Sequence, residues 1–139
     1  MSELIKRMEV TEMTKKKFFG KPFRWGTCDC ARIAAFHAHK FGWKIPTTGR
    51  YRSHRTAKQA LGKLGFKTIP DLVTAVGLLE IPPSRAMIGD IVSFASDAEI
   101  GAVGIVIGNG NMIAFHEAAE GAAIISMGQI EKAWSISNG

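Results

Sequence analysis

The N-terminal part of the chain, about residues 1–80, carries apolar side chains at the three- and four-residue intervals that are typical of α-helices. Polar residues that can cap a helix precede these stretches, because their side chains can accept a hydrogen bond from a backbone N–H of the first turn. The candidate caps are Ser2, Asp29, and either Ser53 or Thr56. The pattern predicts helices from Ser2 to about Lys15, from about Cys30 to Phe41, and from Ser53 or Thr56 to Gly65. A shorter helical piece is predicted to follow Pro70-Asp71 and to run to Leu79.

The first two predicted helices each have an apolar face. In the first helix this stripe consists of Leu4, Ile5 and Met8. In the second helix the face consists of Cys30, Ile33, Ala34, His37 and Phe41. A helix with such a stripe usually packs it against the rest of its domain.

Beyond Pro82-Pro83 the pattern changes to short apolar or β-branched runs that are separated by Gly and Asn, which is typical of strands. The runs are GDIVSFA, AVGIVIG, NMIAFHE and AAIISM. Between the second and third runs, residues 108–111 carry the Asn-Gly signal of a tight hairpin. Helices followed by an antiparallel sheet indicate an α+β fold. We expect one domain over residues 1–139, with a helical part at about 1–80 and a sheet part at about 88–136.

Composition agrees with a single domain that has a hydrophobic core, because 46% of the 139 residues are hydrophobic. No apolar run approaches the roughly 18 residues of a membrane span. The segment MSELIKRMEV is charged where an export signal would be apolar, so we expect no such signal. The two cysteines are too close in sequence to form a disulfide that would stabilise the fold, which favours a reducing compartment.

The net charge of +6 conceals an uneven distribution along the chain. Residues 1–67 contain sixteen Lys and Arg against four Asp and Glu, whereas residues 68–139 contain two against eight. Two solvated faces would explain this split, since exposed charge is the default. Alternatively, a particle with a basic and an acidic side could dock among neighbours in an assembly or lie on an anionic polymer. We expect no nucleic-acid partner, because no recognition-helix or zinc-finger pattern accompanies the basic residues.

Cys30 stands at the predicted start of a helix, directly after the candidate cap Asp29. Unpaired backbone N–H groups and the helix dipole favour a thiolate at such a place. For acyl transfer the thiolate also needs a base, normally a histidine from a neighbouring element. A buried cysteine that behaves as a small hydrophobic residue is the alternative interpretation.

Among the four histidines, only His116 lies on the predicted sheet and could serve as that base. His37 is about 10 Å from Cys30 along the same helix, which is too far for direct proton transfer. We expect His54 to be solvated beside a basic loop. Four residues look in sequence like a set of zinc ligands: Cys28, Cys30, His37 and His39. Helix positions two apart diverge by about 200°, however, so His37 and His39 could not both face one ion. We therefore expect no metal site and no cofactor.

Several segments together resemble the NlpC-type papain-like cysteine peptidases. They are FRWGTCDCARIAAF, GDIVSF with Gly89-Asp90, and VGIVIGNGNMIAF. More narrowly, Trp25-Gly26, Asp29-Cys30, GRYRS at 49–53 and AW at 133–134 resemble small phage tail-tip-associated members of this superfamily. The resemblance implies a papain-like NlpC-type fold in which Cys30 takes the position of the nucleophile.

The resemblance also implies that the catalytic histidine would stand at Ala102 and the residue that orients it at Ala114. Alanine can neither accept a proton nor hold an imidazole, and general-base help is worth roughly 10² to 10⁴ in rate. His116 would point to the same face as Ala114 but is displaced by about 6.6 Å along the strand. A local bulge could compensate for that displacement.

The resemblance therefore favours a structural component of a phage or phage-derived tail tip that is catalytically inactive. Trp25, Asp29, Gly89 and Asp90 would remain as structural motif residues. The expected partners are other tail-tip proteins, such as hub or distal tail subunits, in a virion tail made in the host cytoplasm. One alternative is an active peptidase or amidase, with Cys30 and His116, that opens peptidoglycan locally during genome delivery. Another is a module that binds cell-wall peptide without cutting it.

Overall fold

The computed structural model describes residues 2–46, 51–95, 99–115, 121–128 and 130–137. Helices come first: α1 (Glu3–Phe18), α2 (Cys30–His39), α3 (His54–Lys63) and α4 (Ile69–Val76). The strands follow: β1 (Glu80–Ile81), β2 (Ile91–Phe94), β3 (Ala102–Gly108), β4 (Asn111–Ala114), β5 (Ala123–Ser126) and β6 (Ile130–Trp134). A 3₁₀ turn, η1 (Pro83–Arg85), connects β1 to β2.

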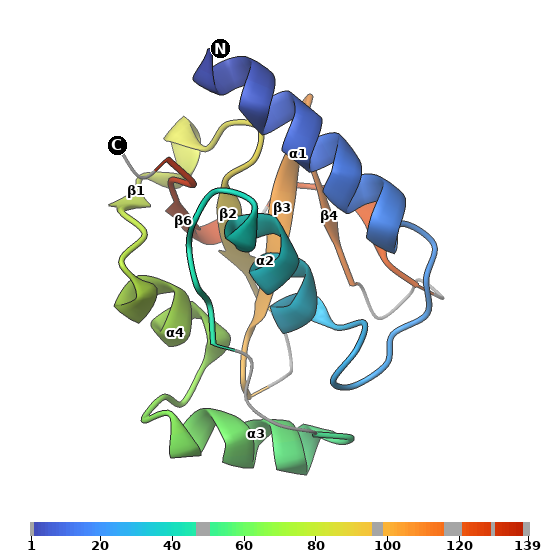
Figure 1. Ribbon diagram of the computed structural model, residues 1–139, viewed down its shortest axis with the longest axis vertical. Coiled ribbons are helices and arrows are strands. Elements are labelled where there is room, and N and C mark those ends of the chain that lie inside the picture. Colours follow the sequence, from blue (N-terminus) through green and yellow to red (C-terminus); the bar gives the residue numbers. More distant parts are fainter. Residues whose placement is uncertain (1, 47–50, 96–98, 116–120, 129, 138–139) are drawn as a thin grey trace.

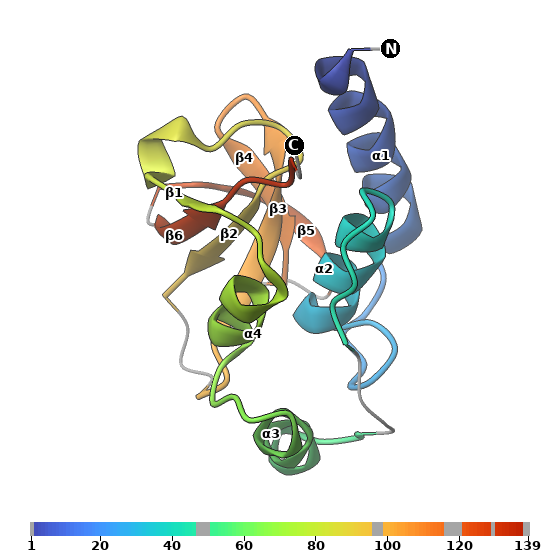
Figure 2. The same cartoon turned by 60° about the vertical axis from the view of Figure 1, so that its left-hand side comes forward.

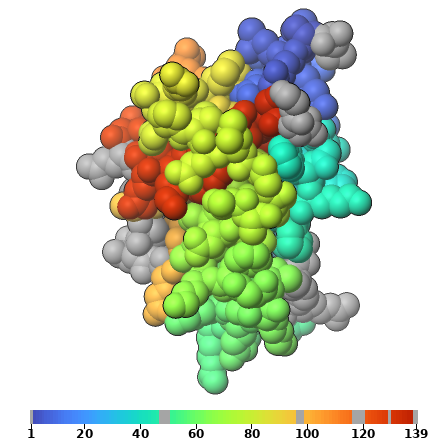
Figure 3. All heavy atoms as spheres, turned by 90° about the vertical axis from the view of Figure 1, so that its left-hand side faces the viewer, coloured from blue at the N-terminus to red at the C-terminus, as the bar shows by residue number. Residues whose placement is uncertain are grey.

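The strands form one antiparallel sheet in the order β1-β6-β2-β3-β4-β5. Helices α1 and α2 lie side by side over one face of this sheet, whereas α3 lies at one end of the molecule (Figures 1 and 2). Figure 3 shows α3, α4, β1 and η1 as one continuous flank, with β6 beside it. This arrangement confirms the predicted α+β class. No helix in the described ranges has the length and apolar character that crossing a membrane requires.

The predicted helix caps are confirmed. The side chains of Ser2, Asp29 and Ser53 accept hydrogen bonds from backbone N–H groups in the first turns of α1, α2 and α3. Ser53 rather than Thr56 is the cap of α3, and Thr56 completes a reciprocal capping box with it. The start of α4 was predicted less well, since its cap is Thr68.

The predicted hairpin is also confirmed, because β3 and β4 pair on either side of its turn. Asn109 and Gly110 both have positive φ, at 56° and 73°. Two consecutive residues in this region suit the tight turn that follows the right-handed twist of the strands. Strands β1 and β6 were not predicted, because β1 has only two residues and β6 lacks regular alternation.

Helix α1 buries a different face from the one that its apolar stripe suggested. Leu4, Ile5 and Met8 are 50%, 47% and 53% exposed. The buried face consists instead of Arg7, Val10, Thr11, Thr14 and Phe18. Burying polar side chains is tolerated when they have partners, and Arg7 and Thr14 find theirs at the start of β2 and on α2. The hydroxyl of Thr11 has no hydrogen-bond partner among the described residues.

The hydrophobic core lies between the helices and the sheet. Ile33 and Ala34 on α2 pack there with Val103 and Ile105 on β3 and Ile113 on β4. A second, smaller apolar cluster consists of Val92, Val106, Met112, Ala114 and Ala133. Alternate residues of β3 thus belong to different clusters, as expected for a strand that is covered on both faces.

Candidate functional site

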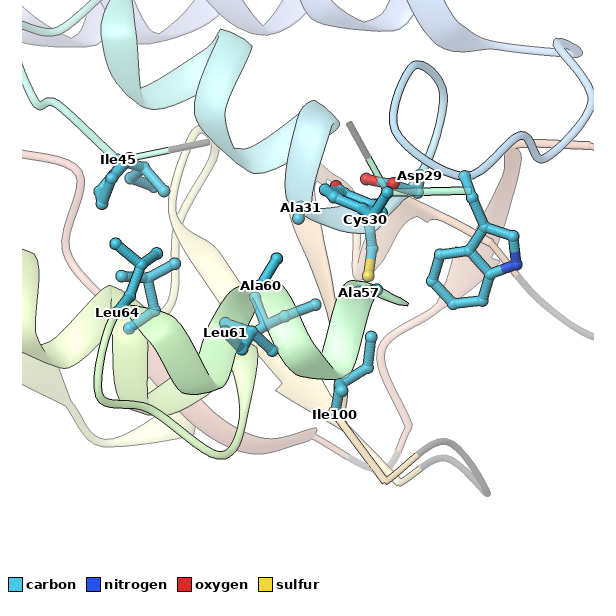
Figure 4. A pocket seen from close by; sticks show the side chains of 14 residues that line it. Asp29, Cys30, Ala31, Ile45, Ala57, Ala60, Leu61, Leu64 and Ile100 are labelled. Carbon is cyan, nitrogen blue, oxygen red and sulfur yellow. The ribbon is translucent and has the colours of Figure 1, made fainter. Parts of the chain in front are cut away.

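Cys30 is the first residue of α2, and its sulfur points across a pocket toward Ala57 on α3 and Ile100, which precedes β3 (Figure 4). The pocket is lined almost entirely by apolar side chains from α2, α3 and α4 and the segments that join them. Its volume of about 40 Å³ holds a few water molecules at most, since one water needs roughly 10–15 Å³ on this measure. A peptide segment therefore has no room beside the sulfur.

The thiol of Cys30 is held in its neutral form. Some surface of the residue remains accessible, but the thiol itself is enclosed. Burial raises its pKa from 9.0 to about 11, against the lowering effect of a hydrogen bond from the backbone of Val103, and the carboxylate of Asp29 raises it further. A catalytic cysteine needs a shift in the opposite direction.

The carboxylate of Asp29 is occupied in holding the local structure together. One oxygen accepts from the N–H of Arg32 at 2.9 Å, and the other accepts from the N–H of Gly26 at 2.9 Å. The hydroxyl of Tyr51 also hydrogen-bonds to this carboxylate. The pKa of Tyr51 is raised, mainly by burial and to a smaller extent by the negative charge of Asp29. Asp29 is 2% exposed, so it acts as the buried cap that the sequence predicted.

The two alanines at the positions that the resemblance assigns to catalytic partners occupy different places. Ala102 begins β3 and pairs with Phe94, and the residue after it, Val103, reaches the sulfur of Cys30 through its backbone. Ala114 is fully buried in the second apolar cluster and does not line the Cys30 pocket. The start of β3 therefore lies beside Cys30 as the resemblance implied, and it presents no imidazole there.

His116, the predicted alternative base, lies outside the described residues, as do Gly49 and Arg50 of the GRYRS segment. His54 was expected to be solvated, but it is the first residue of α3 and is half-buried. Its ring packs edge-on against Trp25 with the centroids 6.0 Å apart, and its Nε2 is buried without a hydrogen-bond partner among the described residues. His54 does not line the pocket around the sulfur.

His37 has a structural role. Its Nδ1 is 2.8 Å from the hydroxyl of Thr14, and its Nε2 is 2.8 Å from the carbonyl oxygen of Gly89. Burial lowers its pKa from 6.5 to about 4, so the ring is neutral at physiological pH. Among the described residues, no group of three or more His, Cys, Asp and Glu side chains is arranged to hold a metal ion.

Gly89 and Asp90 anchor the helices to the sheet. Asp90 is fully buried, and its Oδ1 accepts from the guanidinium of Arg7 at 2.7 Å and from the N–H of Ile136 at 2.9 Å. Its Oδ2 accepts from the N–H of Met87 at 3.0 Å. Gly89 has a φ of 91°, and a Cβ at this position would lie 3.4 Å from the side chain of Arg7. The Gly-Asp motif thus ties α1, the start of β2 and the segment after β6 together.

The two motif tryptophans are placed differently. Trp25 lines the Cys30 pocket and contacts the rings of Phe23 and Tyr51. Trp134, in the closing AW motif, is fully buried, and its indole N–H donates to the hydroxyl of Thr74 at 3.0 Å. The remaining side chains that enclose the sulfur, such as Ala57 and Ile100, were not predicted, because no local signal reports what a distant helix covers.

Solved structures with the same fold are NlpC/p60 domains. The chain matches the NlpC/p60 domain of the peptidoglycan hydrolase SagA with a TM-score of 0.61 and 19% identity, over 91% of this chain and 97% of that one. It also matches NlpC2 from Trichomonas vaginalis (TM-score 0.61, 15% identity, 94% of this chain and 47% of that one). An NlpC/p60 family protein from Bacillus cereus ATCC 10987 matches with a TM-score of 0.61 and 19% identity, over 93% of this chain and 40% of that one.

These matches define the class of protein: a domain with an NlpC/p60-type, papain-like fold. At such low identities they concern the fold alone. Within this class the chain belongs to the family described as a domain of unknown function, DUF6950, whose model matches residues 7–136. No curated protein matches the chain in sequence.

Proposed function

We propose that this chain is a catalytically inactive NlpC/p60-type domain that serves as a structural component of a phage or phage-derived tail tip. The fold supports descent from a peptidoglycan hydrolase-like ancestor. The proposed inactivity rests on the surroundings of Cys30, and the proposed tail location rests on the resemblance of the motifs around Trp25, Asp29 and Gly89-Asp90 to tail-tip-associated members.

The proposed inactivity rests mainly on the thiol of Cys30, which is enclosed and protonated. Its pKa of about 11 leaves almost no thiolate at neutral pH. The resemblance assigns a base to position 102 and its orienting group to position 114, and both residues are alanine. The pocket volume of about 40 Å³ excludes a peptide substrate. These three features support the proposal that the domain does not hydrolyse peptides.

The structural role is supported by features that suit docking. The outward stripe of Leu4, Ile5 and Met8 gives α1 an exposed apolar face, and such faces are typical of contact surfaces. The excess of basic residues in 1–67 and of acidic residues in 68–139 favours contacts with neighbours of complementary charge. The proposed neighbours are hub or distal tail proteins, and the proposed location is the virion tail.

Inactivity is tested by incubating purified peptidoglycan with the protein and with its Cys30→Ala variant, and by measuring released muropeptides by mass spectrometry. We expect no release above that of the variant. The NlpC/p60 domain of SagA is the positive control for the assay. Release that depends on Cys30 would refute the proposal, and its loss in His116→Ala would identify the base of an active peptidase.

The tail role is tested by purifying assembled particles and measuring the amount of this chain per particle by quantitative mass spectrometry. A structural component is expected at a fixed copy number that resists washing with high salt. A chain that is absent from particles, or present in amounts that vary between preparations, would refute the tail role without affecting the conclusion on catalysis.

A further inference from the structure

We propose that the surface on both sides of the turn at residues 24–28 is a docking groove for an acidic segment of a partner protein that carries an apolar anchor residue. The groove consists of two open hollows that share Thr27. Their volumes are about 480 and 360 Å³, whereas the Cys30 pocket has about 40 Å³. The inference rests on the proposed structural function, because it names the surface with which the domain meets a neighbour.

The first hollow presents one open aromatic ring. Phe23 is 42% exposed, yet its ring is braced edge-on by two others. Its centroid is 4.8 Å from that of Trp25 and 5.2 Å from that of Phe115, at interplanar angles of 89° and 87°. A ring that is already held in place loses little conformational entropy on binding, so Phe23 is suited to receive an apolar side chain.

The turn that separates the two hollows is firmly held. Arg24 and Cys28 exchange two backbone hydrogen bonds of 2.8 Å. Gly26, at their centre, has a φ of 83° and donates its N–H to the buried carboxylate of Asp29. A Cβ at Gly26 would lie 2.5 Å from the carbonyl oxygen of Tyr51, so the turn packs closely on the segment behind it. The groove is therefore preformed.

Both hollows are strongly basic. Arg24 and Arg52 line the first and are exposed, and Lys17 and Lys40 line the second. Among the described residues, none of these four side chains forms an ion pair, and no Asp or Glu lines either hollow. Carboxylates of a partner would supply charge opposite to that of these four side chains.

The second hollow concentrates positive charge around one ring. The ammonium groups of Lys17 and Lys40 lie 4.9 and 5.2 Å from the centroid of Phe36. The two ammonium groups are therefore no more than about 10 Å apart, which is close to the Debye length of about 8 Å at physiological salt. An anion bound in this hollow would offset their repulsion, and each ammonium group is held near the ring by a cation–π contact.

An acidic protein segment fits these features better than a nucleic acid does. A single strand of nucleic acid stacks successive bases on several open rings. Here Phe36 and Trp25 are half-buried, and among the described residues that line the groove Phe23 is the one strongly exposed ring. One apolar anchor flanked by carboxylates matches one open ring flanked by guanidinium groups.

The test uses a fluorescein-labelled glutamate-rich peptide with one central phenylalanine, and measures its binding to the full chain by fluorescence anisotropy. Three further probes accompany it: the peptide with Gln in place of Glu, the peptide with Ser in place of Phe, and an oligothymidylate of equal length. We expect the acidic peptide with phenylalanine to bind most tightly, and its affinity to fall as salt is raised.

The double variant Arg24→Glu/Arg52→Glu should weaken binding about ten-fold or more, and Phe23→Ala should weaken only the peptides that contain phenylalanine. Lys63→Glu/Lys67→Glu changes the net charge equally at exposed positions outside both hollows, so it should leave binding within about two-fold. Circular dichroism melts confirm that each variant is folded.

Equal losses in the two double variants would show unspecific attraction and overturn the inference, as would tighter binding of oligothymidylate or no binding of any peptide. If the peptide fails to bind but particles contain the chain at fixed copy number, the docking groove alone is refuted. If the peptide binds as expected but particles lack the chain, the groove stands and the tail role is refuted.

Discussion

The enclosed thiol of Cys30 leads to a quantitative prediction about its reactivity. Only the thiolate is alkylated, so the rate follows the ionised fraction. A cysteine at the ordinary pKa of 9.0 is about 3% ionised at pH 7.5, whereas one at about 11 is about 0.03% ionised. The folded protein should therefore react about 100-fold more slowly at Cys30 than the unfolded chain does, and restricted access to the pocket would slow it further.

The assay follows iodoacetamide labelling by mass spectrometry across a range of pH in the Cys28→Ser variant, where Cys30 is the only thiol. The same variant in denaturant supplies the unfolded reference rate. We expect the folded protein to show an inflection well above pH 9, because burial favours the neutral thiol.

Two further variants make the result specific. His54→Ala and His116→Ala, each in the Cys28→Ser background, should leave the pH profile unchanged, because neither imidazole would be paired with the sulfur. An inflection below pH 8.5 in the folded protein, or one that moves upward when either histidine is removed, would refute the reasoning and restore the interpretation as an active peptidase.

Three predictions concern the interior of the fold. Asp90→Ala should lower the free energy of unfolding, measured with urea, by about 3–5 kcal/mol, because it removes the buried carboxylate that neutralises the guanidinium of Arg7. Glu3→Gln removes only the exposed partner of Arg7 and should cost less than about 1 kcal/mol. The free energy of unfolding should fall by up to about 3 kcal/mol as pH is lowered from about 6.5 to about 4, because the unfolded chain takes up a proton at His37 before the folded chain does. His37→Gln should flatten this pH dependence. A variant with the same pH profile as the original protein would contradict this role of His37. Ala114→His should lower the midpoint of thermal unfolding, because the ring would enter a closed apolar cluster at a cost of at least about 1–3 kcal/mol. This variant should also have no hydrolase activity, and peptidoglycan hydrolysis by it would contradict that expectation.

Some parts of the fold were predictable because their signals are local. The caps Ser2, Asp29 and Ser53 act on backbone groups only three residues away, so the residues that surround them in sequence suffice to predict them. The same holds for the hairpin at Asn109-Gly110, where the backbone conformation of two residues selects the turn. The α+β class followed from the order of such signals along the chain.

Other features depend on neighbours that are distant in sequence. The apolar stripe of α1 indicated the wrong buried face, because the helix is oriented by the pairing of Arg7 with Asp90 across 83 positions. His37 could not be recognised as structural before Thr14 and Gly89 were brought against it. Polar residues can be buried when the tertiary structure supplies partners, and no local pattern reports those partners.

The candidate site divides in the same way. The sequence alone determined that Cys30 begins a helix behind a capping aspartate, and that alanine stands at 102 and 114. Only the tertiary structure decided that α3 covers the sulfur and raises its pKa, and that Phe23, Arg24 and Arg52 share an open hollow. A cap depends on bonds within one turn of chain, whereas burial, pKa and surface charge depend on every segment that folds within a few ångströms of the group.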